Sequence, residues 1–415
     1  MNQEVFQTLL CPSGQEVIQA ALDLAPEETD FLRHFTTLSR LYPSDLARAA
    51  LEIAILRKEG MRKFPFAERI YMTRPSLEQA SNYLASMYRA MRYSGFDRIM
   101  DLGCSIGGDT LSLATAAPTY GIDLDPLRLA MAQANLAALN LNDRVAFIQA
   151  DLSSNFPISL PTGTALFFDP SRRTKERRIF SVNEYRPPLN VIQSWLPICP
   201  ALGVKISPGV RLEEIRSYDA EVEFISIRGE LKEAVLWFGL LKTAQRRATV
   251  LSGAFALSDL SDHGSIKTMV SSPGQAHQQA LPLSEPLDFL YEPDPSILRS
   301  GLVHTLGEQL DAAQLDPDIA YLTSHKQIDT PFARVWKVES WHPFGVKRLR
   351  ELLRKRGIRK VVVKKRGSPL RPETLIHALH LEKDTGSSLT ERTLFLTHLR
   401  GQPIVVVCFP LNQTP

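Results

Sequence analysis

The sequence predicts an α/β fold in which a Rossmann-like sheet of mainly parallel strands stands between a helical N-terminal region and a smaller α+β region. Short apolar segments alternate with connecting segments between residues 98 and 206, several of them with helical spacing, and this alternation is typical of βαβ units. A glycine-containing turn follows the first apolar segment. Two further apolar runs, 221–227 and 233–241, flank a short polar turn and predict a hairpin that ends the sheet with an antiparallel pair.

The turn after the first strand has the composition of a cofactor-binding loop. Residues 99–110 read Ile-Met-Asp-Leu-Gly-Cys-Ser-Ile-Gly-Gly-Asp-Thr. Glycine permits positive φ and close approach of a ligand, and the following helix N-terminus offers unpaired N–H groups. Ser105 stands where a dinucleotide fingerprint has its second glycine, and Asp101 would repel a pyrophosphate. An acid here can attract the ammonium of S-adenosylmethionine, for which we predict binding by Asp101, Gly103, Cys104 and Gly107.

Acids also follow the next three predicted strands. Asp123 ends the strand 118–123, about 20 residues after the glycine turn, where a carboxylate can bind ribose hydroxyls. Asp125 lies two residues further on and is the alternative ribose ligand; we prefer Asp123 because it ends the strand. Asp151 follows the strand 144–150, and we predict that it and Leu152 lie at the adenine. Because ligands of open α/β sheets bind at the carboxyl ends of the strands, these acids predict one site.

In this order and spacing, the motifs resemble the class I S-adenosylmethionine-dependent methyltransferases over residues 76–255. The resemblance is strongest to a bacterial group with a C-terminal THUMP-like domain, which is itself similar to trimethylguanosine synthase-type RNA methyltransferases. It implies a seven-stranded sheet with an antiparallel last strand. It also implies an enzyme that uses S-adenosylmethionine.

The chemistry is expected at Asp169-Pro170-Ser171-Arg172-Arg173, directly after the fourth strand, 164–168. Methyl transfer is an in-line displacement, so alignment and desolvation of the nucleophile matter most. We predict that Asp169 and Pro170 hold the target atom and that Arg172 and Arg173 contact RNA. Many amino-methyltransferases have a second proline and an aromatic residue where this chain has Ser171 and Arg172.

The segments that flank the predicted core give three further expectations. The segment 1–75 carries apolar residues at helical steps and predicts a helical cap, and the pair Lys63-Phe64 matches a pair in the resembling group that could touch the cofactor or target. A single helix from Ser76 to Met91 is predicted, with Ser76 and Gln79 at capping-box spacing. Cys199 is either a nucleophile or a structural thiol; we favour the structural interpretation because prolines flank it.

The remaining chain divides by composition into three parts. We predict a linker at 256–284, a small ferredoxin-like α+β region at 285–340, and a basic THUMP-like domain at 341–415. Between Trp341 and Pro372 there are 12 Lys/Arg and one Glu, a local charge of +11 in a chain whose net charge is only +3. Such a face favours phosphate binding. The residues predicted to contact RNA here are Lys347, Arg354, Lys364, Lys365 and Arg366.

Composition also limits the other possibilities. Four scattered cysteines without a C-x-x-C pair argue against disulfides and a structural zinc, and His377 with His380 lacks the further ligands of a metal site. No targeting or membrane segment is expected, and the predicted location is cytoplasmic. Three alternatives stay open: a small-molecule methyltransferase, a protein methyltransferase, or a non-catalytic RNA-binding protein on a methyltransferase fold. The oligomeric state and the methylated atom are not predicted.

Overall fold

The computed structural model describes residues 1–153, 160–172, 180–253, 265–271, 280–381 and 391–410. The chain forms two compact units. The first contains residues 1–227, 232–245 and 251–266, and the second contains 228–231, 246–250 and 267–415. Arg173 of the predicted target motif lies outside the described residues.

The first unit contains the predicted α/β sheet. Seven strands of a nine-stranded sheet run in the order β3-β2-β1-β4-β5-β7-β6, with β1 to β5 parallel to one another and β7 antiparallel to β5. This order and the antiparallel last strand confirm the predicted fold class. The strands are β1 (Arg98–Leu102), β2 (Thr119–Asp123), β3 (Val145–Gln149), β4 (Thr164–Phe168), β5 (Leu202–Ile206), β6 (Glu221–Ile227) and β7 (Glu230–Trp237).

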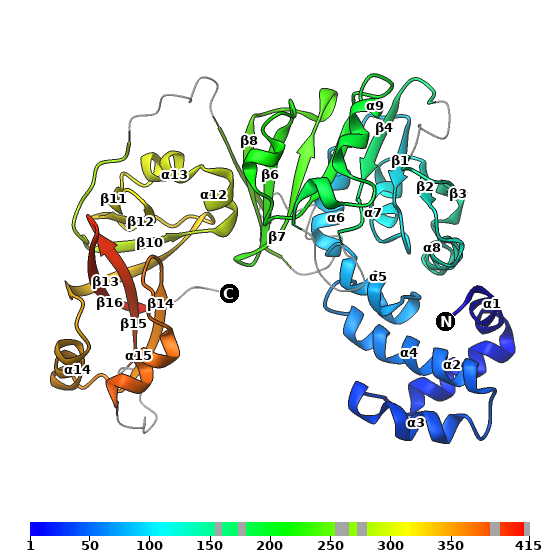
Figure 1. Cartoon of the computed structure of the whole chain (residues 1–415), viewed down its shortest axis with the longest axis horizontal. Helices are drawn as coiled ribbons and strands as arrows, with labels where there is room; N and C mark the ends of the chain where they lie inside the picture. The colour runs from blue at the N-terminus through cyan, green and yellow to red at the C-terminus, as the bar shows by residue number, and fades with distance from the viewer. Residues whose placement is uncertain (154–159, 173–179, 254–264, 272–279, 382–390, 411–415) are drawn as a thin grey trace. The chain divides into compact units, whose positions relative to one another are not determined.

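Helices surround this sheet and form the N-terminal part of the same unit (Figure 1). The connecting helices are α7 (Gly108–Ala116), α8 (Pro126–Ala138), α9 (Ile192–Trp195) and α10 (Leu212–Ile215). The N-terminal helices are α1 (Gln3–Leu10), α2 (Pro12–Asp23), α3 (Phe31–Leu38), α4 (Ser44–Gly60), α5 (Arg74–Gln79) and α6 (Tyr83–Met91). A buried side chain joins the two groups, because Asn135 on α8 exchanges hydrogen bonds with the backbone of Tyr71 and donates to the carbonyl of Ile106.

The expected single helix 76–91 is wrong, because the chain breaks at residues 80–82. Thr73, and not Ser76, is the N-cap of α5, and its side chain forms a capping box with Ser76. Ala80 is extended, and the Asn82 side chain accepts from the N–H of Leu84 to start α6. Asn at an N-cap accepts from a backbone N–H of the first helical turn that has no partner within the helix. The break leaves Ser81 outside both helices.

The second unit has its own seven-stranded sheet, in the order β11-β12-β10-β13-β16-β15-β14. Among the strand pairs of this sheet in the described residues, only β14–β15 is parallel. The strands are β10 (Phe289–Pro293), β11 (Ala313–Asp316), β12 (Ile319–Ser324), β13 (Ala333–Pro343), β14 (Lys360–Lys365), β15 (Glu391–Leu399) and β16 (Gln402–Pro410). The helices are α12 (Pro295–Ser300), α13 (Val303–Gln309), α14 (Val346–Lys355) and α15 (Pro372–Leu379).

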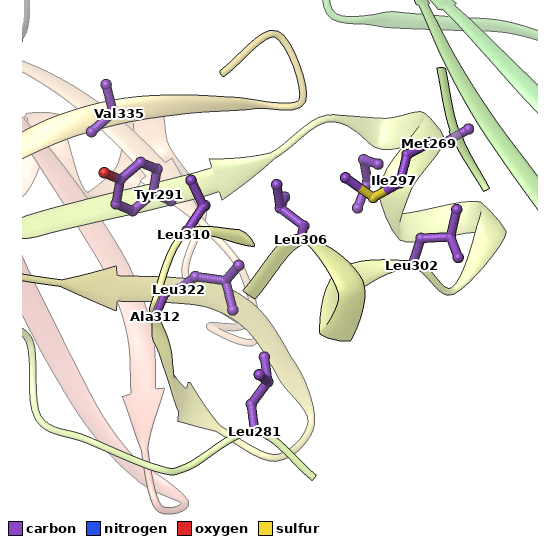
Figure 2. Packing of buried hydrophobic residues seen from close by; sticks show 11 residues of the cluster. Met269, Leu281, Tyr291, Ile297, Leu302, Leu306, Leu310, Ala312, Leu322 and Val335 are labelled. Carbon is purple, nitrogen blue, oxygen red and sulfur yellow. The ribbon is translucent and has the colours of Figure 1, made fainter. Parts of the chain in front are cut away.

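Two sequence expectations in this region are corrected. The helix expected from Ser296 to Ala313 is two helices, because Gly301 adopts φ 74° and ends α12. The stretch 256–284 contains a strand, β9 (Ile266–Val270), which lies beside β8 (Arg246–Leu251). Met269 of β9 is buried in the same apolar cluster as Leu306 and Leu322 (Figure 2).

We expect this cluster to stabilise the second unit. Leu306 is fully buried, and replacing it by alanine removes apolar contacts and leaves a cavity. Leu306→Ala should therefore lower the free energy of unfolding by about 2–5 kcal/mol in urea denaturation. Leu41→Ala is the matched control, because Leu41 is 73% exposed, and it should change the free energy by less than about 0.5 kcal/mol. Equal effects of the two substitutions would contradict this assignment.

Candidate active site

A cavity of about 750 Å³ opens at the carboxyl ends of the parallel strands in the first unit. Its wall includes Gly103 after β1, Asp123 at the end of β2, Asp151 after β3, and Asp169 after β4. Strands β1 and β4 end in register, with Leu102 beside Phe168, so the segments that follow them enter the cavity together. The sequence motifs are thus brought to one place by the topology of the sheet.

The glycine turn is held tightly between the ends of two strands. Gly103 has φ 83°, and a Cβ there would lie 2.9 Å from the carbonyl oxygen of Asp169. Gly107, with φ 82°, is the N-cap of α7 and does not line the cavity, whereas Cys104 does. Ser105 also has positive φ, 51°, and donates its backbone N–H to Asp123 at 2.9 Å. This backbone state of Ser105 had no signal in the sequence.

The acids after β2 and β3 have different surroundings. Asp123 is 7% exposed, lines the cavity, and accepts from the N–H groups of Ser105 and Asp125, which orient its carboxylate. Asp125 instead caps α8 by accepting from Leu127 and Arg128. Asp151 and Leu152 both line the cavity, Leu152 buried and Asp151 exposed. Hydrogen bonds from Ser153 hold the pKa of Asp151 below its ordinary value.

Asp101 lies beneath the turn rather than in the cavity wall. It is 1% exposed, Thr110 donates its hydroxyl to Oδ2, and Oδ1 has no hydrogen-bond partner in the described chain. Burial, and then repulsion by Asp109, raise the pKa of Asp101 to about 8. At neutral pH this carboxyl is therefore largely protonated in the free protein.

Two buried cations and their acids lie at the floor of the cavity, where Lys205, Asp109 and Glu233 line it and Arg89 lies behind them. Arg89 on α6 is 1% exposed and contacts Asp109 and Glu233, each at 2.6 Å. Burial alone would lower the pKa of Arg89, but the attraction of Asp109 and Glu233 raises it above the ordinary value. For Asp109 burial opposes ionisation, yet Arg89 and Lys205 keep its pKa below the ordinary value. Burial raises the pKa of Glu233.

Lys205 on β5 connects this floor to the predicted target motif. Its Nζ donates to Asp169 Oδ2 at 2.6 Å and to Ser81 Oγ at 2.7 Å, and its side chain is 3% exposed. Sequence reasoning missed Arg89, Lys205 and Glu233. They lie inside helix and strand patterns, and only the fold brings them together.

Pro170 and Arg172 of the target motif also line the cavity. Arg172 is half-buried, and its Nη1 is buried without a hydrogen-bond partner among the described residues. A buried guanidinium donor of this kind favours an anionic acceptor such as a phosphate oxygen.

Lys63 and Cys199, for each of which the sequence allows two roles, both contact other parts of the protein. Lys63 also lines the cavity, but its ammonium donates to the carbonyls of Leu77, Glu78 and Ala80 at the end of α5. Cys199 is buried, and its thiol lies 3.2 Å from the carbonyl oxygen of Thr164. Burial raises the pKa of the Cys199 thiol, and Cys199 does not line the cavity.

The five predicted RNA-binding cations of the second unit have unequal surroundings. Lys347, Arg354 and Lys365 are exposed, although Arg354 donates to the carbonyl of His380. Lys364 is half-buried, pairs with Glu292, and lies over the ring of Trp336. Arg366 donates to the carbonyl of Ala320 and lies over Tyr321. Lys347 and Lys365 are therefore the better candidates for phosphate contacts.

Comparisons with known proteins agree with this geometry. A family model described as RNA cap guanine-N2 methyltransferase matches residues 96–185, a THUMP domain-like model matches residues 333–410, and a domain of unknown function matches residues 2–59. A candidate methyltransferase from Porphyromonas gingivalis W83 shares the fold, with a TM-score of 0.75, over 96% of this chain and 99% of that one at 20% identity.

A relative in two strains of Mycobacterium tuberculosis places the chain in a family. It is an uncharacterised S-adenosylmethionine-dependent methyltransferase, 32% identical over 316 residues, which are 74% of this chain and 80% of the relative. The fold and the site define a class I methyltransferase. The chain belongs to the family of S-adenosylmethionine-dependent methyltransferases, and S-adenosylmethionine is its cofactor.

Part of the stability should depend on pH through Asp101. Between pH 4 and 8 the folded protein retains a proton on this carboxyl that the unfolded chain releases. Stability from this group is complete at low pH, and it falls by up to about 1.4 kcal/mol per pH unit until the pH passes the folded pKa. Asn cannot titrate, so the wild type should lose stability relative to Asp101→Asn in urea denaturation from pH 5 to 8. Parallel stability profiles would contradict the raised pKa.

Proposed function

We propose that the protein methylates RNA, that its cavity binds S-adenosylmethionine beside a target base, and that the second unit binds the RNA backbone. The observation that carries the proposal is the placement of Asp169-Pro170 in the same cavity as the glycine turn and Asp123. The family models over residues 96–185 and 333–410 support RNA as the substrate.

The cavity fits the cofactor. Gly103 lines the cavity, and its positive φ and close approach to the carbonyl of Asp169 leave no space for a side chain at this position. We propose that Gly103 and Cys104 lie along the methionine part, with Asp101 and Gly107 supporting this turn from beneath. Asp123 would bind the ribose, and Asp151 and Leu152 the adenine. Asp125 is already used as the cap of α8, which favours Asp123 as the ribose ligand.

The roles of the protein groups follow from the reaction. When bound, S-adenosylmethionine supplies a methyl group on a positively charged sulfur; a lone pair of the target atom forms the new bond, and the carbon–sulfur electron pair stays on sulfur. In this proposal Asp169 accepts a hydrogen bond from a target amine and receives the proton that the amine must release. Arg172 binds an RNA phosphate next to the target nucleotide.

Cofactor binding should depend on Asp123 and not on Asp125. Asp123→Ala removes charge-assisted hydrogen bonds to the ribose and should weaken S-adenosylmethionine binding at least about 100-fold in calorimetric titration. Asp125→Ala is the matched control; it should lower stability by about 1 kcal/mol through loss of a helix cap while leaving the affinity within about threefold. Loss of binding in Asp125→Ala alone would reverse the assignment.

Transfer of tritiated methyl groups to total RNA tests the activity itself. The wild type should label RNA, and Asp123→Ala should not. Label in protein or in small molecules, with none in RNA, would contradict the proposal and favour one of the other methyltransferase classes. Cofactor binding without any methyl transfer would favour a non-catalytic RNA-binding protein.

RNA affinity should depend on the exposed cations of the second unit. The double variant Lys347→Ala/Lys365→Ala should weaken RNA binding at every salt concentration, and the slope of log affinity against log salt should fall by about 1 for each lost phosphate contact. Lys326→Ala is the control, because Lys326 is an exposed lysine of the same unit that pairs with Asp311 outside the basic segment. Equal slopes for the double variant and the wild type would exclude these contacts.

A further inference from the structure

The Lys205–Asp169 pair has hydrogen-bonding capacity that the described protein does not use. An ammonium has three N–H donors. Ser81 and Asp169 accept two of them, while the nearest oxygen of Asp109 lies 4.0 Å away, beyond hydrogen-bond distance. The third donor therefore has no hydrogen-bond partner among the described residues. Lys205 is 3% exposed and lines the cavity, so this donor is available to a group that binds there.

Asp169 has an unused hydrogen-bond acceptor next to the unused donor of Lys205. Its Oδ2 accepts from Lys205, and its Oδ1 has no hydrogen-bond partner in the described part of the chain. The side chain is 19% exposed and borders the same cavity. One ion pair of 2.6 Å thus offers the cavity an open donor and an open acceptor a few ångströms apart.

The charge of the pair restricts what can occupy this position. The ammonium and the carboxylate cancel, so the pair gives no net attraction to a cationic amine or to a carboxylate. A protonated aliphatic amine would place its charge against Lys205, and a carboxylate would place its charge against Asp169. A neutral group that carries a donor next to an acceptor satisfies both positions without an unpaired charge.

Resting on the proposed function, we infer that Lys205 is a specificity-determining residue that recognises the target as a neutral, planar amino-heterocycle, the class of group found on nucleobase edges. Lys205 donates to the ring nitrogen or carbonyl oxygen beside the reacting amine, and Asp169 Oδ1 accepts from that amine. Ser81 holds the lysine in place, because the helix break at residues 80–82 brings its hydroxyl to the ammonium.

The test compares Lys205→Met with Lys58→Met in the full-length protein. Lys58 is a matched control, because it is a lysine in an exposed ion pair with Glu27 in the N-terminal helices. Tritiated methyl transfer to total RNA is measured with calorimetric binding of S-adenosylmethionine, and the labelled RNA is digested to nucleosides to identify the methylated atom. Lys205→Met should lower kcat/KM for RNA at least about 100-fold while the cofactor Kd stays within about threefold. Lys58→Met should match the wild type.

A second variant keeps the test valid if the single substitution prevents folding. Removing one partner of a buried ion pair leaves an uncompensated charge, whereas Lys205→Met/Asp169→Asn leaves none. The double variant should fold, bind the cofactor, and transfer no methyl group to RNA. The single variant Asp169→Asn keeps Lys205, which still donates to the target. It should therefore bind RNA more tightly than the double variant, measured as KM or as Kd.

The outcomes separate the two proposals. Labelled RNA with unchanged kcat/KM in Lys205→Met contradicts the inference alone. Labelled RNA in which the methyl group lies on a ribose oxygen, or on a base atom other than an amino nitrogen, also contradicts the inference alone. Absence of label from RNA with the wild type contradicts the proposed function and the inference together.

Discussion

The cavity depends on a guanidinium that is removed from water. Arg89 comes from α6, and its partners Asp109 and Glu233 come from α7 and β7, so one side chain fixes three elements around the end of the sheet. An uncompensated charge at this depth would be very unfavourable, and the two carboxylates together with the ring of Phe167 compensate it. The arrangement holds Asp109 and Glu233, which both line the cavity, in fixed positions.

The order and type of the main elements followed from the sequence because each depends on local chemistry. The glycine turn, the Asp125-Pro126 start of α8 and the tight turn between β6 and β7 are all short-range signals. The errors occurred where short-range signals competed. At residues 80–82 the apolar spacing of a single helix continues across a break, after which Asn82 caps the start of α6. Gly301 ends α12 within an otherwise helical sequence pattern.

The residues of the candidate site likewise fall into those that the sequence could predict and those that it could not. Residues at strand ends, such as Asp123, Asp151 and Asp169, could be predicted because parallel strands bring their carboxyl ends to one edge. Asp101 was placed near the correct turn, but its burial and its protonation could not be inferred from its neighbours in sequence. Lys205 occupies an inward position of a fully buried strand, where an apolar residue is expected. Its partners Ser81 and Asp169 are 124 and 36 residues away along the chain.

The amide of Asn135 also connects the N-terminal region to the glycine turn. It contacts the backbone of Tyr71 on one side and the carbonyl of Ile106 in the glycine turn on the other. Arg69 further donates to the carbonyl of Ala138 at the end of the same helix. A minimal catalytic fragment cut at residue 76 or 96 would therefore expose a polar, half-satisfied surface directly behind the cofactor loop. The N-terminal region is therefore a structural support of that loop.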